Sequence, residues 1–89
     1  MNNKALINTL NRITVSGKES LEAMVICTEA LRIAREDNVA KTAAICLNEL
    51  QRVKVSGEED IDRLLGCMQE CEKALNSAED ANHDDCHDQ

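Results

Sequence analysis

Apolar residues recur along the chain at intervals of three and four, the spacing of one face of an α-helix. Four such stripes can be traced: Leu6, Ile7, Leu10 and Ile13; Leu21, Met24, Val25, Thr28, Leu31 and Ala34; Val39, Ala43, Cys46, Leu47, Leu50 and Val53; and Ile61, Leu64, Leu65, Met68, Cys71, Leu75 and Ala78. No stretch of useful length alternates with the period of two that indicates a strand. The pattern predicts an all-α protein with four amphipathic helices.

The junction between the second and third stripes allows two interpretations. Asp37 or Asn38 could cap a new helix, but residues 35–41 contain no Gly or Pro that would force a break. A continuous helix over residues 18–53 would be about 50 Å long at about 1.5 Å per residue, too long to fold back on itself. We favour the break, which gives two helical hairpins forming a four-helix bundle within one chain or shared between two.

Residues 5–38 align with residues 45–78 without a gap, at an offset of 40. Nine of the 34 aligned positions are identical: Asn8/Asn48, Leu10/Leu50, Arg12/Arg52, Val15/Val55, Ser16/Ser56, Gly17/Gly57, Glu19/Glu59, Cys27/Cys67 and Ala34/Ala74. A period near 40 is the size of a helical-hairpin repeat unit, so we expect an internal duplication. The predicted organisation is a single helical domain over residues 1–78, followed by an acidic disordered tail over residues 79–89.

Each half contains the same short motif ahead of its second predicted helix. The stretch VSGKES contains Ser16 and Glu19, and the stretch VSGEED contains Ser56 and Glu59. Both fit S-x-x-E, in which the Ser oxygen accepts the backbone N–H three residues on and the Glu reaches back to the Ser N–H. We therefore expect two capping boxes that begin equivalent helices. The residues before each box suit a short extended connector, and pairing of the two connectors would involve too few residues to hold a sheet.

Composition and charge narrow the possible partners. The chain has no Phe, Trp or Tyr, and its formal net charge is −7. Because aliphatic, Met and Cys side chains bury less area than aromatic ones, we expect modest stability and a homo-oligomer, with a dimer as the first guess. Residues 77–89 hold five acidic residues and no Lys or Arg, which leaves twelve acidic against ten basic residues elsewhere. We expect no direct nucleic-acid binding, because this nearly neutral body offers no basic stripe.

The sequence also indicates where the protein acts. No run approaches the roughly 18 apolar residues of a membrane span, and the first residues do not follow the charged-then-apolar pattern of a signal peptide. There are five cysteines: Cys27, Cys46, Cys67, Cys71 and Cys86. We expect a cytoplasmic protein without a membrane partner, in which reduced thiols serve as small core residues. A disulfide between Cys27 and Cys67, which occupy equivalent positions in the two halves, is the alternative.

One spacing of Cys and His residues resembles that of a metal site. The series Cys67-x3-Cys71-x11-His83-x3-His87 has the two-Cys, two-His order of a zinc site. Both cysteines lie within a predicted helix instead of a hairpin knuckle, and large apolar residues between the ligand pairs are nearly missing. We therefore predict no metal site, and a weak site in the tail, made with Cys86, is the lesser alternative.

Catalytic groups are not brought together by any pattern. Both histidines fall in the predicted tail, no phosphate-binding glycine loop occurs, and the acidic run of residues 58–60 is explained by a helix start. We predict no catalytic residue, no cofactor and no enzyme activity. Arg12 and Arg52 recur beside the two motifs, so they are the candidate residues for binding a partner or ligand, although charge complementarity at a helix C-terminus explains them too.

The two halves carry a further likeness in VSGKESLEAMVIC and VSGEEDIDRLLGC. The shared V-S-G-x-E box with the spacing from Leu21 to Cys27, and from Ile61 to Cys67, resembles small uncharacterised accessory proteins of temperate bacteriophages and prophages. The resemblance implies a protein of the bacterial cytoplasm that binds and inhibits or modulates a host protein, such as a nuclease or a defence complex. The alternative is a protein that binds or sequesters a nucleotide-like signal, and a metal-binding module is a lesser one.

Overall fold

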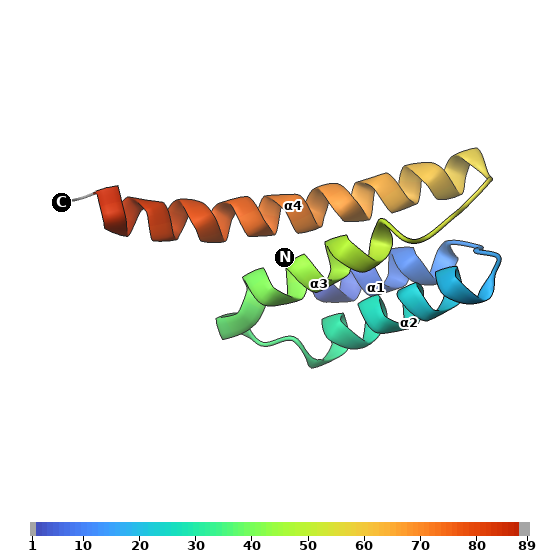
Figure 1. Cartoon of the computed structure of the whole chain (residues 1–89), viewed down its shortest axis with the longest axis horizontal. Helices are drawn as coiled ribbons and strands as arrows, with labels where there is room; N and C mark the ends of the chain where they lie inside the picture. Colours follow the sequence, from blue (N-terminus) through green and yellow to red (C-terminus); the bar gives the residue numbers. More distant parts are fainter. Residues whose placement is uncertain (1, 88–89) are drawn as a thin grey trace.

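The computed structural model describes the backbone of residues 2–87 and the side chains of residues 2–77. It contains the helices α1 (Asn3–Arg12), α2 (Lys18–Ile33), α3 (Val39–Leu50) and α4 (Glu58–His87), and the short 3-10 helix η1 (Glu36–Asn38). The described residues form no strand, so the prediction of an all-α protein with four helices is confirmed. The helices run alternately in opposite directions (Figure 1), so that the connector between α1 and α2 and the connector between α3 and α4 lie at the same end of the molecule.

The helical structure is interrupted between α2 and α3, as predicted. Helix α2 ends at Ile33, and Ala34 and Arg35 are extended, with ψ angles of 145° and 165°. The Arg35 N–H donates to Oδ1 of Asn38 over 2.8 Å, which closes the turn, and α3 begins directly afterwards. A continuous helix over residues 18–53 is therefore excluded.

Each helix of the bundle packs against two neighbouring helices and not against the helix diagonally opposite. Helix α1 packs against α2 and α4, and α3 packs against α2 and α4, whereas no Cα atoms of α1 and α3, or of α2 and α4, lie within 8 Å of each other in the described part of the chain. The core consists of Leu6, Leu10, Ile13, Ala23, Cys27, Leu31, Ala43, Cys46, Leu50, Val53, Leu64, Cys67 and Cys71. It is thus built from small and aliphatic side chains, with Leu10 and Leu50 among the largest that are fully buried.

The predicted stripes of α2 and α4 combine two faces of each helix. Leu31 of the predicted α2 stripe is 2% exposed, whereas Leu21 and Val25 of the same stripe are 54% and 59% exposed. Ala23 and Cys27, which the stripe does not include, are completely buried. Leu65 of α4 is 50% exposed, although the pattern places it in the same stripe as buried Cys71. Each of these helices therefore has an apolar face toward the core and further apolar residues in contact with solvent.

Two reciprocal hydrogen bonds tie the connectors to the opposite halves of the chain. The Lys54 N–H donates to Oγ of Ser20 over 3.0 Å, and the Thr14 N–H donates to Oδ2 of Asp60 over 3.2 Å. Ser20 and Asp60 are each the third residue of their helix, and both the donors and the acceptors are 40 residues apart. The connectors are thereby fixed without forming a sheet.

The predicted capping boxes are wrong. The N-cap of α2 is Gly17, with φ 95° and no side-chain hydrogen bond to the helix. The carbonyl of Gly17 accepts from the Leu21 N–H over 3.1 Å, and the carbonyl of Gly57 accepts from the Ile61 N–H over 2.9 Å. Both helices thus begin after the glycine and not after the serine. The positive φ of Gly17 lies in a region that side-chain-bearing residues rarely adopt, so the glycine sets the direction of the chain here.

Replacing Ser20 with alanine is expected to lower the free energy of unfolding by about 1 kcal/mol, because the Lys54 N–H loses its partner. Ser20 is only 3% exposed, so water cannot easily replace the hydroxyl. Urea denaturation followed by circular dichroism measures the loss. The control is Ser16→Ala, which removes the serine of the expected capping box and should change stability by less than about 0.5 kcal/mol. A larger loss of stability in Ser16→Ala than in Ser20→Ala would support the capping box.

Helix α4 is longer than the other helices, and its C-terminal part extends past them in Figure 1. It includes most of the segment 79–89, for which the sequence predicts an acidic disordered tail. The side chains from residue 78 onward, with those of His83, Cys86 and His87, lie outside the described residues. The predicted tail and its weak metal site therefore stay predictions.

Candidate groove between α1 and α4

The two arginines that recur in the sequence lie at the end of the bundle where α1 connects to α2 and α3 connects to α4. Arg12 is exposed in the last turn of α1, and Arg52 follows the end of α3. The guanidinium of Arg52 pairs with Oε1 of Glu49 at 3.1 Å and with Oε1 of Glu19 at 3.3 Å. Exposed pairs of this kind contribute about 0–1 kcal/mol, so Arg52 connects the two halves weakly. Binding of a partner or ligand by these arginines stays a prediction.

Four cysteines meet in the core. Cys27 of α2, Cys46 of α3, and Cys67 and Cys71 of α4 are all buried and carry free thiols. The Cys46 thiol donates to the carbonyl oxygen of Cys27 over 3.6 Å. The prediction that these cysteines serve as core residues is confirmed, and Cys27 and Cys67 are not joined by a disulfide.

The surroundings of the thiols disfavour their ionisation. A hydrogen bond with Cys27, together with burial, raises the pKa of Cys46 to about 12, although a hydrogen bond with Cys71 acts in the opposite direction. Burial, followed by the charge of Cys71, raises the pKa of Cys67 to about 11. A hydrogen bond with Cys46 raises the pKa of Cys71 as well. Because the thiolate is the metal ligand and the nucleophile, these groups are poorly suited to either role at neutral pH.

The zinc-like spacing in the sequence, for which we predict no metal site, does not bring its cysteines and histidines together among the described residues. Cys67 and Cys71 point into the core, and no group of three or more Cys, His, Asp or Glu side chains within residues 2–77 is arranged to hold a metal ion. His83 and His87 lie outside the described side chains.

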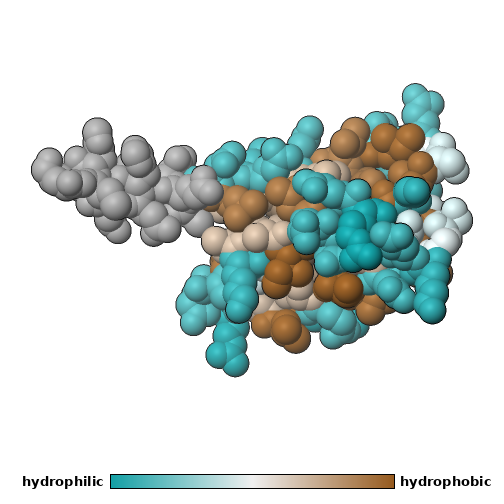
Figure 2. Space-filling model, in the orientation of Figure 1, coloured by the Kyte–Doolittle hydropathy of each residue, from teal (hydrophilic) through white to brown (hydrophobic). Residues whose placement is uncertain are grey.

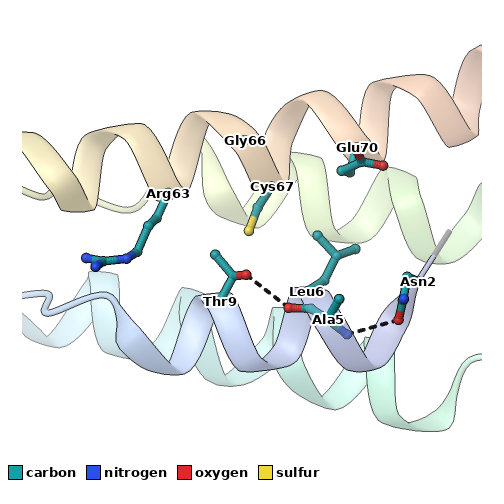
Figure 3. Close-up of a pocket in the computed structure, with 8 residues that line it drawn as sticks. All are labelled: Asn2, Ala5, Leu6, Thr9, Arg63, Gly66, Cys67 and Glu70. Atoms are coloured by element: carbon teal, nitrogen blue, oxygen red, sulfur yellow. Dashed lines mark hydrogen bonds between the residues drawn. The ribbon is translucent and has the colours of Figure 1, made fainter.

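A groove of about 330 Å³ lies between α1 and α4 (Figure 3). Its lining residues are Asn2, Ala5, Leu6, Thr9, Arg63, Gly66, Cys67 and Glu70. Leu6 and Cys67 belong to the core, and Figure 3 shows the sulfur of Cys67 directed toward α1. The groove therefore reaches from solvent to the buried interior.

Small residues on the facing helices keep this groove open. Gly66 lies within α4, and a Cβ added there would meet no atom within 4 Å. Ala5 lines the groove from α1. At the positions 40 residues away, α2 carries Ile26 and α3 carries Ile45. The positions equivalent to the glycine and the alanine of the groove are thus occupied by two isoleucines in the other half.

Three of the four polar side chains that line the groove, those of Asn2, Thr9 and Arg63, form hydrogen bonds within the protein, and the fourth, Glu70, lies 3.8 Å from Nζ of Lys73. The Arg63 guanidinium donates to Oδ1 of Asp60 over 2.9 Å and lies 3.5 Å from Oε2 of Glu59. The Thr9 hydroxyl donates to the carbonyl of Ala5 over 3.0 Å, and Oδ1 of Asn2 accepts from the Ala5 N–H over 3.0 Å. Because most of these polar groups are engaged, the groove offers mainly apolar contacts to another molecule.

Gly66→Ala is expected to raise the free energy of unfolding by about 1 kcal/mol, because glycine is an unfavourable residue in a helix interior and alanine is the most favourable. The added methyl group has open space around it. Denaturation in urea measures the gain. The control is Gly17→Ala, which should destabilise the protein because φ of Gly17 is 95°. A loss of stability in Gly66→Ala would mean that the groove is closed.

Comparison with protein-family models, with curated proteins and with solved structures finds no match to this chain. Within the part of the chain that the structure describes, no helix combines the length and the apolar character needed to cross a membrane.

The groove is indicated in the sequence by residues that are not repeated between the halves. A search for identical residues in the two halves identifies Arg12 and Arg52. The groove lies instead where the halves differ, at Gly66 opposite Ile26 in the alignment and at Ala5 opposite Ile45. A glycine within a helical pattern, without a turn or a close backbone contact to explain it, is the residue that could have identified this site.

Proposed function

We propose that the protein is a non-enzymatic binding module that accepts aliphatic side chains of another protein in the groove between α1 and α4. The observation that carries this proposal is Gly66, which costs helix stability and leaves a groove open down to Leu6 and Cys67. A groove of this kind, apolar at its floor with a mostly engaged rim, suits the anchoring residue of an amphipathic helix.

The nature of the partner rests on the sequence. The likeness of the two VSG segments to accessory proteins of temperate phages supports a bacterial host protein as the partner, with inhibition or modulation of a nuclease or defence complex as the outcome. Four buried free thiols support action in the reducing cytoplasm. We also propose that the bundle arose by duplication of a hairpin of about 40 residues. The reciprocal bonds of Ser20 and Asp60 support this origin, because their donors and acceptors are related by the same offset.

Binding of a small ligand is the second candidate function. The groove volume of about 330 Å³ is at the lower end of the range for ligand pockets, which supports this alternative. The engaged rim leaves few polar groups to orient a nucleotide-like molecule, so we rank protein binding first. A small molecule that co-purifies with the chain and is displaced by filling the groove would reverse this ranking.

The proposal is tested by filling the groove. The immobilised chain is exposed to bacterial lysate and compared with Gly66→Leu, which places a leucine side chain in the groove. We expect the bound protein to decrease at least about tenfold, because loss of a central anchor costs at least about 2 kcal/mol of binding energy. The control is Gln69→Leu, which adds the same side chain at an exposed position of α4 outside the groove. Equal capture by both variants, with unchanged helicity, would contradict the proposal.

A further inference from the structure

Helices α2 and α4 each carry a second stripe of residues that faces solvent, beside the face that packs into the core. The residues follow one another at intervals of three and four, the heptad spacing of helices that pair with other helices. The basic-ended stripe of α2 consists of Lys18, Leu21, Val25, Thr28 and Arg32, and the acidic-ended stripe of α4 consists of Glu58, Ile61, Leu65, Met68 and Glu72. Each position of one stripe is 40 residues from its counterpart in the other.

The middle of each stripe is apolar and accessible. Leu21 and Val25 are 54% and 59% exposed in the basic-ended stripe, and Ile61 and Leu65 are 40% and 50% exposed in the acidic-ended stripe. Figure 2 shows hydrophobic atoms gathered over the N-terminal half of α4, at the upper right of the molecule. Four large aliphatic side chains in contact with water, arranged at helix-pairing spacing, indicate surfaces that are covered by another helix.

The ends of the two stripes have opposite charges at the same positions. Lys18 corresponds to Glu58, and Arg32 corresponds to Glu72, and all four side chains are exposed. Arg32 already pairs with Glu29 of its own helix at 3.0 Å through one nitrogen, which leaves its other N–H groups available for a second carboxylate. The stripes are therefore complementary to each other in charge, whereas each would repel a copy of itself.

A single chain cannot bring its own stripes together. Helices α2 and α4 lie on a diagonal of the bundle, and none of their Cα atoms lie within 8 Å of each other over the described residues. The basic-ended stripe borders α1, since Leu21, Val25 and Thr28 line a shallow depression together with Leu10 and Ile13. The complement of each stripe must therefore come from another molecule, and the molecule known to carry it is a second copy of this chain.

We propose that copies of this protein associate head to tail, with the basic-ended stripe of one copy against the acidic-ended stripe of the next. With α2 and α4 side by side and parallel, Leu21 lies near Ile61 of the next copy, Val25 lies near Leu65, and the charged ends meet as opposite pairs. The contact joins two different surfaces, so it is heterologous and each added copy leaves one stripe of either kind free. It extends beyond a dimer, or closes into a ring.

This inference is independent of the groove between α1 and α4. The basic-ended stripe lies on α2, which does not line that groove, and no residue of the acidic-ended stripe on α4 lines it. Each copy in the assembly keeps its own groove uncovered. Failure of self-association and failure of partner binding can therefore be observed separately.

The test uses sedimentation of the full chain over a range of concentrations. We expect the average mass to rise past that of a dimer, and the association to weaken several-fold between about 0.02 M and about 0.5 M salt, where screening removes the charge contribution. A wild-type chain that stays monomeric throughout, or that stops at a dimer, overturns the proposal.

Two variants distinguish this contact from a symmetric one. Val25→Glu disrupts the basic-ended stripe and Leu65→Glu disrupts the acidic-ended stripe, both at exposed positions that should leave the helicity unchanged. Each variant alone is expected to be monomeric, and an equimolar mixture is expected to form a heterodimer through the two intact stripes. Self-association of either variant at the wild-type level, or a mixture that stays monomeric, contradicts the proposal. The control is Ile33→Glu, at a residue of α2 that is 73% exposed and does not line the surface depressions formed by the stripe, and it should associate as the wild type does.

Discussion

Leu10→Ala or Leu50→Ala is expected to lower the free energy of unfolding by about 3 kcal/mol in each case. Both leucines are 1% exposed and are among the largest fully buried side chains in the protein. The chain contains no aromatic residue, so no larger neighbour can move into the space that the leucine leaves. The cost therefore includes both the lost burial of the side chain and the remaining cavity. Urea denaturation followed by circular dichroism measures it.

The expected loss is a large part of the total stability of a domain of this size, which is about 5–15 kcal/mol. If an alanine variant does not fold, Leu10→Val and Leu50→Val give the same comparison with a smaller cavity. The matched control is Leu21→Ala, because Leu21 is 54% exposed and its truncation should cost less than about 0.5 kcal/mol. Equal costs at Leu10 and Leu21 would contradict the packing of the core.

The four helices could be predicted because each is encoded by its own local sequence, in which apolar residues recur every three or four positions. The break before α3 was open to two interpretations, since it depends on one residue, Asn38, whose side chain closes the turn by accepting from Arg35. The pattern could not separate the two apolar faces of α2. Leu21 and Leu31 fit one helical stripe equally well, yet Leu21 is exposed and Leu31 is buried, and only the positions of α1 and α3 decide this.

The reciprocal bonds between the halves were missed for a different reason. Ser20 and its donor Lys54 are 34 residues apart, and Asp60 and its donor Thr14 are 46 residues apart, so no local spacing reports these bonds. Ser20 and Asp60 are also not identical in the alignment, although both offer a short oxygen acceptor. Comparing the halves by hydrogen-bonding capacity, instead of by identity, would have identified this pair.

The candidate surfaces follow a similar rule. Residues that the halves share, such as Leu10 and Leu50, hold the bundle together. Residues that differ between the halves form the groove at Gly66 and set the opposite charges of Lys18 and Glu58. Under the proposed duplication, distinct binding surfaces arise only where the halves diverge, so these differences are the more informative part of the sequence.

Raising the pH above 9 is expected to unfold the protein through its buried thiols. The pKa of Cys46 is raised from its ordinary value of 9.0 to about 12, and that of Cys67 to about 11, by the hydrogen bonds and burial described above. At a pH between the pKa of the thiols in the unfolded chain and their raised pKa in the folded chain, the unfolded chain loses the thiol protons and the folded chain keeps them. The folded state thus binds more protons, and stability falls as the pH rises. Each such thiol contributes about 1 kcal/mol of loss per pH unit.

Urea denaturation at a series of pH values from neutral to about 11 measures this dependence, with the chain kept under reducing conditions. Cys46→Ala should reduce the slope above pH 9 by the contribution of one thiol, whatever its effect on stability at neutral pH. Ile13→Val provides a destabilised control, since it removes one buried methylene group and no titrating group, so its slope should equal that of the wild type. A wild-type slope of zero between pH 9 and 11 would show that the thiols ionise in the folded protein. The cysteines would then be accessible to solvent, and the core assembled around them would have to be revised.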